Sequence, residues 1–85
     1  DVYYVTAHIV RAVSALNQVL FAINEQYCIN DKKAVSMIDH FHIHPIGYKE
    51  KVNSIFAAAG TDSTNACSQL RELINEVNGL VPIHE

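Results

Sequence analysis

The sequence contains few of the residues that define most specialised protein classes. Its 85 residues include two cysteines, two prolines, three glycines and no tryptophan. With 49% hydrophobic residues, the chain is too apolar to be disordered. Cys28 and Cys67 have no CxxC or CxxxH spacing and fall within helix-like patterns, so we expect reduced, mostly buried thiols. A disulfide or a metal site is the alternative.

Positive charge is also scarce. Six lysines and arginines are spread along the chain, and the net charge is −3 with histidines neutral. A nucleic-acid-binding module normally carries a basic stripe, so this composition argues against nucleic acid as a partner. Polar or charged residues interrupt every apolar stretch before it reaches the roughly 20 residues needed to cross a bilayer. We therefore expect neither a membrane-spanning segment nor a signal peptide.

The chain opens without a methionine, and its first residues already fit a helical pattern. Its length suits one domain spanning residues 1–85. We therefore expect a single-domain fragment of a longer, cytoplasmic protein of bacterial type, with a companion domain missing upstream.

The dominant pattern in the sequence is one long amphipathic helix over residues 2–27. Apolar residues recur at spacings of three and four along one continuous face, and no glycine or proline interrupts it. The positions on this face are Val2, Val5, Ile9, Ala12, Val13, Leu16, Val19, Leu20, Ile23 and Tyr27.

Three shorter helices are expected to follow. Asn30 is a suitable N-cap for the second, which should end between residues 39 and 41. The third should span about residues 48–59 before Gly60, and the fourth should follow a cap at Thr61 or Asp62 and end at Gly79. No strand-like alternation is present. Short connections favour antiparallel neighbours, so the predicted fold is an all-α, up-and-down four-helix bundle with one long N-terminal helix.

The long helix carries a second apolar stripe. Tyr3, Val10 and Phe21 nearly coincide in direction on a helix that turns 100° per residue. A helix that is apolar on two faces usually contacts two neighbours. Either the short helices wrap far enough to cover both faces, or this stripe is the interface for a missing domain or for a second copy in a homodimer.

The sequence shows no catalytic centre. It has no Gly-x-Ser-x-Gly elbow and no glycine-rich phosphate loop. The densest polar cluster contains His40, His42 and His44, which share one side of an extended backbone. Because a zinc site needs three or four converging ligands and no fourth strong ligand is suitably spaced, we expect an exposed histidine-rich loop and no metal. A metal-responsive module is a weaker hypothesis.

A family resemblance covers roughly residues 9 to 56. The run Leu20-Phe21-Ala22-Ile23-Asn24-Glu25-Gln26-Tyr27, followed by Asn30-Asp31-Lys32-Lys33-Ala34, resembles the helical C-terminal domain of an uncharacterised bacterial family of nucleotidyltransferase-like proteins. In that family a Leu-Phe-Ala-Leu-Asn run precedes an aromatic residue and a Glu-Lys pair. Here Ile23 replaces the second leucine of that run, and Asp31 replaces the glutamate. The Pro-containing turn at residues 41–45 is also similar.

The resemblance implies an accessory role. In such proteins an N-terminal catalytic domain holds the carboxylates and Mg²⁺, and the helical domain packs against it and walls the cleft for nucleotide and acceptor. Asn24, Tyr27 and Lys32 would then contact a nucleoside triphosphate in the parent protein, while this chain itself binds no cofactor. The alternative is that Tyr27 belongs to the core, Asn24 bonds locally at a helix end and Lys32 is solvated. A non-enzymatic interaction or dimerisation module is the competing function.

Overall fold

The computed structural model describes residues 2–27 and 31–82, without the side chains of residues 2, 31 and 32. This part of the chain forms four helices: α1 (Val2–Ile23), α2 (Asp31–Ile38), α3 (Tyr48–Ala59) and α4 (Ser63–Leu80). Within these described ranges there is no strand, which confirms the all-helical prediction. The expected N-cap Asn30 lies outside the described residues, as does Cys28.

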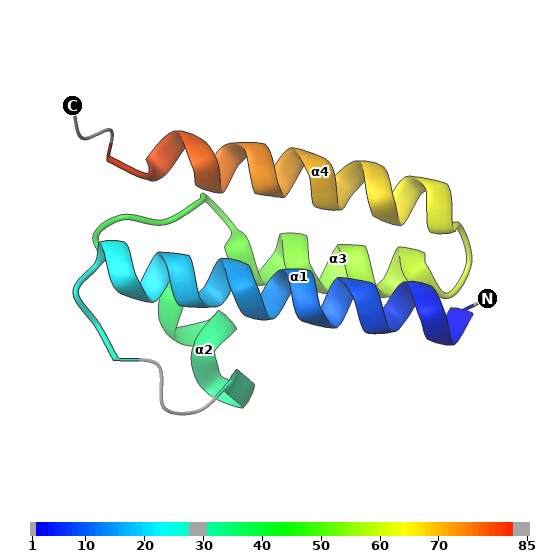
Figure 1. The fold of residues 1–85 in the computed structure, drawn as a ribbon, viewed down its shortest axis with the longest axis horizontal. Helices are drawn as coiled ribbons and strands as arrows, with labels where there is room; N and C mark the ends of the chain where they lie inside the picture. The colour runs from blue at the N-terminus through cyan, green and yellow to red at the C-terminus, as the bar shows by residue number, and fades with distance from the viewer. Residues whose placement is uncertain (1, 28–30, 83–85) are drawn as a thin grey trace.

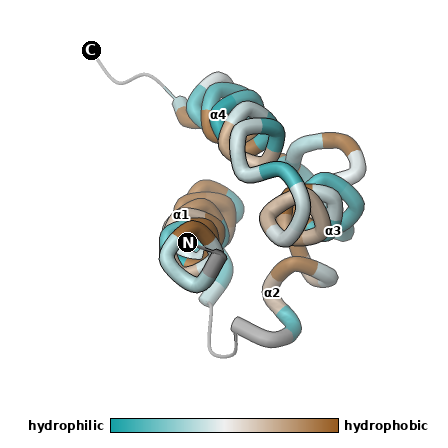
Figure 2. Tube along the Cα trace, turned by 90° about the vertical axis from the view of Figure 1, so that its right-hand side faces the viewer, coloured by the Kyte–Doolittle hydropathy of each residue, from teal (hydrophilic) through white to brown (hydrophobic). Residues whose placement is uncertain are grey.

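Three of the helices run along the long axis of the molecule (Figure 1). α1 and α4 run in the same direction, and α3 runs in the opposite direction between their ends. Viewed along the axis, α1, α3 and α4 form a triangle, and α2 lies beside α1 and α3 (Figure 2).

α2 is too short to act as a full-length member of the bundle. Its 8 residues span about 12 Å, whereas the 22 residues of α1 span about 33 Å. Figure 1 shows α2 under the C-terminal half of α1 alone. The described fold is therefore a compact four-helix domain whose second helix covers only part of the first.

The core lies where the three long helices and α2 face one another. Burial of such side chains contributes roughly 1.5–3 kcal/mol each for the larger aliphatic and aromatic residues. The buried apolar side chains are Ile9, Val13, Leu16, Leu20, Phe21, Ala34, Ile38, Tyr48, Val52, Ile55, Ala59, Ala66, Leu73 and Val77. The 3.6-residue pattern of the sequence identifies most of these positions. On α1 it fails at Val19, which was expected on the buried face but is 36% exposed.

The helix boundaries agree with the sequence in part. α3 has the expected bounds, and Asp62 caps α4 by accepting the backbone N–H of Asn65 at 3.1 Å. α1, however, ends at Ile23, four residues before the expected end, and the chain then turns through Glu25 with a φ of 55°. Gly79 does not end α4, because the helix continues through it to Leu80, before Pro82.

α1 is long and apolar enough to cross a membrane by length and composition, over Tyr3–Ile23. This corrects the expectation that no segment reaches that length: polar residues are present, but Arg11 is the only charged one among residues 3–23. About a third of this segment is buried inside the fold, where it supplies core residues such as Ile9 and Leu16.

Candidate functional site

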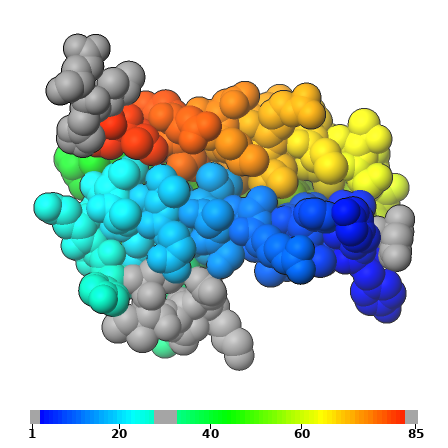
Figure 3. All heavy atoms as spheres, in the orientation of Figure 1, coloured from blue at the N-terminus to red at the C-terminus, as the bar shows by residue number. Residues whose placement is uncertain are grey.

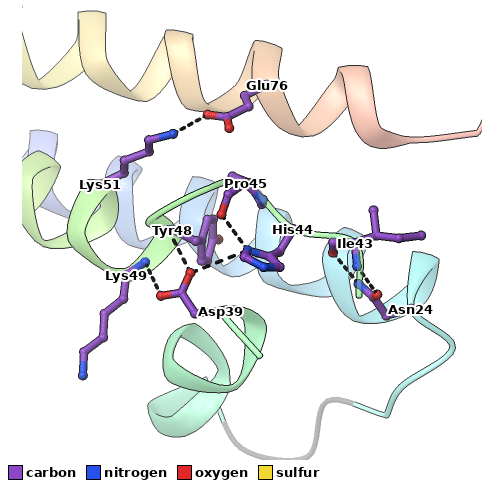
Figure 4. Close-up of polar contacts among 9 residues, drawn as sticks. All are labelled: Asn24, Asp39, Ile43, His44, Pro45, Tyr48, Lys49, Lys51 and Glu76. Carbon is purple, nitrogen blue, oxygen red and sulfur yellow. Dashed lines mark hydrogen bonds and ion pairs between the residues drawn. The ribbon is translucent and has the colours of Figure 1, made fainter. Parts of the chain in front are cut away.

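Asn24 joins the end of α1 to the chain that leads into α3. Its Nδ2 donates to the carbonyl oxygen of Leu20 at 2.7 Å. The same Nδ2 also donates to the carbonyl oxygen of Ile43 at 2.7 Å, and Oδ1 accepts the backbone N–H of Ile43 at 2.9 Å (Figure 4). Both amide hydrogens are therefore engaged within the fold. The local bond to Leu20 was one alternative from the sequence, but the bonds to Ile43, 19 residues away, were not anticipated. A nucleotide that accepts a hydrogen bond from Asn24 would have to replace one of these two carbonyl oxygens.

Tyr27 is exposed. Its side chain has a relative accessibility of 89%, so the alternative that it belongs to the core is wrong, and so is its placement on the buried face of the first helix. The physical reason is that α1 has already ended at Ile23, so helical periodicity no longer directs Tyr27 inward. It lines a shallow hollow together with Gln18, Phe21, Ala22 and Gln26. The side chain of Lys32 lies outside what the structure describes, and its backbone lies in α2.

Asp39 caps α3 from a distance. The N-cap residue of α3 is Gly47, whose left-handed φ of 65° makes the turn but which has no side chain to accept a hydrogen bond. The two carboxylate oxygens of Asp39 accept the backbone N–H groups of Tyr48 at 2.9 Å and Lys49 at 3.1 Å (Figure 4). A carboxylate at this position also complements the positive end of the helix dipole. These two bonds hold the beginning and the end of the loop between α2 and α3 together.

The three histidines do not form a metal site among the described residues. No group of three potential ligands from histidine, cysteine, aspartate or glutamate gathers in residues 2–27 and 31–82. His40 and His42 are exposed. His44 is half-buried, and its Nδ1 lies 2.8 Å from the carbonyl oxygen of Pro45 and 3.8 Å from Oδ1 of Asp39. Because a carbonyl oxygen only accepts, Nδ1 carries the proton in that contact.

Asn17 and Tyr48 form a polar pair inside the core. The hydroxyl of Tyr48 donates to Oδ1 of Asn17 at 2.7 Å, and both residues are buried. Burial raises the pKa of the Tyr48 phenol well above its ordinary value, and the nearby Asp39 carboxylate adds to the rise. Sequence reasoning missed this pair. The available signal was an asparagine between the apolar positions Leu16 and Leu20 on the buried side of the long helix.

The predicted interface stripe divides into two parts. Tyr3 and Val10 are exposed, with relative accessibilities of 88% and 51%. Phe21 is buried at 2%, with its ring packed edge-to-face on Phe41 at a centroid distance of 4.9 Å. Of the two alternatives for this stripe, cover by the short helices is correct for Phe21, and its assignment to an interface is wrong. α2 and the chain after it cover the C-terminal end of that face and leave the N-terminal end open.

A groove lies next to the part of α1 that α2 leaves uncovered. It has a volume of about 200 Å³ and lies between α1, α2 and α3. Its walls are mainly apolar, and two polar side chains of α1 reach it one turn apart. The lining residues are Val10, Val13, Ser14, Asn17, Val35, Val52 and Phe56. We take this groove, with the exposed side of α1, as the candidate functional site.

α3 and α4 are linked on the outside by polar contacts. Nζ of Lys51 lies 2.8 Å from Oε1 of Glu76, and the Ser54 hydroxyl donates to Oε1 of Gln69 at 2.8 Å. Exposed pairs of this kind contribute little to stability. Cys67 is exposed on α4, which corrects the expectation of a buried thiol: it follows the buried Ala66 by one position, so it points away from the core.

Comparisons with known proteins assign this chain neither a family nor a function. The chain matches no family model, no curated protein and no solved structure.

Proposed function

We propose that this chain is a non-catalytic helical domain that docks onto a companion domain through the open side of α1. The observation that carries the proposal is the contrast along one helix face: Phe21 is 2% exposed, whereas Val10 is 51% exposed. Val10 is continuous with the mainly apolar walls of the groove, and a contiguous apolar surface left in solvent marks an interaction site. Figure 3 shows that one face of α1 is in view along the length of the helix, below α4.

The length of α2 suggests what the companion supplies. An up-and-down bundle would place a second helix along the whole of α1, but α2 covers only its C-terminal half. We propose that a helix of the companion packs on the N-terminal half of α1, in the position that a longer α2 would occupy. Docking would then complete the four-helix arrangement that the sequence predicts.

We further propose that the companion is a nucleotidyltransferase-like catalytic domain, as the resemblance implies. In that assembly this chain walls the cleft for nucleoside triphosphate and Mg²⁺. The exposed ring of Tyr27, beside its shallow hollow, suits stacking on a base. Lys32 retains its expected role near phosphate, whereas the bonds of Asn24 suit a structural role better.

The gene sequence upstream of the Asp1 codon provides the first test. It should encode a Gly-Ser followed by paired aspartates, the signature of the catalytic domain. Its absence would rule out the nucleotidyltransferase assignment. Expressed as separate chains, the two segments should form a one-to-one complex by light scattering.

Substitutions on α1 then test the docking surface. Val10→Lys should weaken the complex by about tenfold or more. Val19→Lys is the matched control, because Val19 is also exposed on α1 but lies outside the groove. Equal effects of the two substitutions, or no complex at all, would contradict the proposal. A symmetric dimer of the isolated chain that Val10→Lys dissociates would instead favour the dimerisation module.

Tyr27→Ala tests the cleft-wall role in the complex. Loss of one stacking contact should weaken nucleoside triphosphate binding in the presence of Mg²⁺ by roughly fivefold or more, measured by calorimetry. Met37→Ala is the control, because Met37 is an exposed apolar residue of α2. Unchanged affinity in the Tyr27→Ala complex would remove Tyr27 from the proposed site.

A further inference from the structure

One residue that lines the groove beside α1 has a hydrogen-bond donor with no partner in the described part of the protein. Asn17 is only 3% exposed, and its Oδ1 is occupied by the Tyr48 hydroxyl. Its Nδ2 makes no hydrogen bond. Among the described residues, no fully buried side-chain nitrogen or oxygen lacks a hydrogen-bond partner. Since Nδ2 of Asn17 has no partner, this atom must still be in contact with solvent. Asn17 lines the groove, so we infer that its Nδ2 reaches the surface there.

An amide donor beside apolar walls restricts the chemistry of the group that can bind in the groove. A bare hydrocarbon would desolvate the N–H without replacing its bond to water, at a cost comparable to a lost hydrogen bond. A strongly polar group would meet the side chains of Val10, Val13 and Phe56. The complementary occupant is an apolar body that carries a single hydrogen-bond acceptor.

The size of the groove decides between a small molecule and a side chain. Small-molecule sites usually have volumes of roughly 300–1,000 Å³. The groove has about 200 Å³, which is less than that range. One large side chain of a protein partner matches it better, and interface anchors are most often aromatic.

We propose that the groove receives a tyrosine side chain of the docked partner, with its phenolic oxygen accepting a hydrogen bond from Nδ2 of Asn17. The ring packs against the valines and the face or edge of Phe56. The Ser14 hydroxyl, one turn before Asn17, lies at the same side of the groove and can accept the phenolic proton. The proposal rests on the docking function for the identity of its partner, but its chemistry can be tested on this chain alone.

The test uses p-cresol, which reproduces the tyrosine side chain, and toluene, which lacks the oxygen. Titrated into the isotopically labelled chain at millimolar concentration, p-cresol should shift the NMR signals of the Asn17 side-chain amide and of the Val10 and Val52 methyl groups in a saturable way. Toluene should bind about fivefold more weakly, because it leaves the amide without an acceptor. Absence of saturable shifts, or equal affinities of the two probes, would overturn the inference.

A pair of variants isolates the Asn17 donor. Tyr48→Phe retains Asn17 and should keep the preference for p-cresol. The double variant Asn17→Leu with Tyr48→Phe replaces both members of the buried pair by apolar groups, a change that stability tolerates better than loss of one partner. It should bind toluene at least as well as p-cresol. A preference for p-cresol that survives in a folded double variant would contradict the role of Asn17.

Val10→Lys provides an independent check, because Val10 is half-exposed and its substitution leaves the core intact. It should weaken both probes, and Val19→Lys should weaken neither. If the separately expressed companion forms a complex that Val10→Lys weakens while the probes leave Asn17 unmoved, docking stands and the tyrosine anchor fails. If the probes bind as expected and no complex forms, the groove chemistry stands and the docking function fails.

Discussion

The two ends of α1 differ in how completely they are covered. At the closed end, the C-terminal half of α1 meets α2 and residues 39–48, and Leu20 and Phe21 are 0% and 2% exposed. At the open end, the N-terminal half of α1 has no α2 beside it, and Tyr4 and Val10 are 67% and 51% exposed. The contrast concerns the side of α1 that faces α2, because Ile9 at the open end still belongs to the core. On that side the helix is covered at one end and open at the other.

The closed end is also where the specific polar contacts concentrate. Asn24 holds Ile43, and Asp39 holds the start of α3 at Tyr48 and Lys49 (Figure 4). Apolar burial supplies most of the free energy of such a domain, and directional hydrogen bonds select one arrangement of its loops. The difference between the ends suggests that the closed end maintains the fold and that the open end is free to serve a partner.

The largest expected effect comes from Phe21→Ala at the closed end. Removing a buried ring that packs on Phe41 should lower the free energy of unfolding by about 3–5 kcal/mol. Val10→Ala at the open end should change it by less than about 0.5 kcal/mol. Urea denaturation followed by circular dichroism measures both. Similar losses for the two variants would remove the distinction between the ends.

Asn24→Ala should have the next largest effect. It leaves the Ile43 N–H and the two carbonyl oxygens without their partner in a half-buried site, which should cost about 2–3 kcal/mol. Asn53→Ala on the exposed side of α3 is the control and should be nearly neutral. Hydrogen exchange of the Ile43 amide gives a second readout, since only the Asn24 variant should accelerate it.

Asp39→Ala tests the distant cap of α3. Loss of the carboxylate that accepts two N–H groups should lower the free energy of unfolding by about 1–2 kcal/mol. Asp39→Asn should lose less, because one side-chain oxygen remains to accept. If the two variants are equally stable and both match the original protein, the cap contributes nothing and α3 begins at Gly47 for other reasons.

Tyr48→Phe should have the smallest effect near neutral pH, about 1 kcal/mol. Its stronger signature is at high pH. Because folding raises the pKa of this phenol, the folded state keeps its proton where the unfolded chain has lost it. Stability is therefore complete below the unfolded value of about 10 and falls above it, by at most about 1.4 kcal/mol per pH unit for this group. Tyr48→Phe should have a shallower decline above pH ~10, and an unchanged slope would contradict burial as the cause.

The sequence predicts the parts of this fold that depend on local pattern. α3 has the bounds expected from its apolar face and Gly60, and the cap at Asp62 follows from the preference of carboxylates for helix N-termini. The end of α1 is different, since no glycine or proline marks it. Asn24 ends the periodic segment by bonding to Leu20 and to the distant Ile43, a contact that only the folded chain creates.

The candidate site is less predictable than the fold, for a related reason. Tyr3, Val10 and Phe21 point in one direction on the helix, but their exposure depends on how far α2 extends beside them. Helical periodicity gives direction and contains no information about the length of a neighbour in space. Asn17 is similar: a polar residue on a buried face is visible in the sequence, whereas its partner, Tyr48, is 31 residues away.

The common direction of α1 and α4 has a practical consequence for protein engineering. Because an odd number of long helices spans the molecule, the start of α1 and the end of α4 lie at opposite poles (Figure 1). The longest dimension is 38 Å, so a circular permutant would need a linker of at least roughly 11 extended residues to join them. Copies fused in tandem, by contrast, would continue naturally from pole to pole as an extended array.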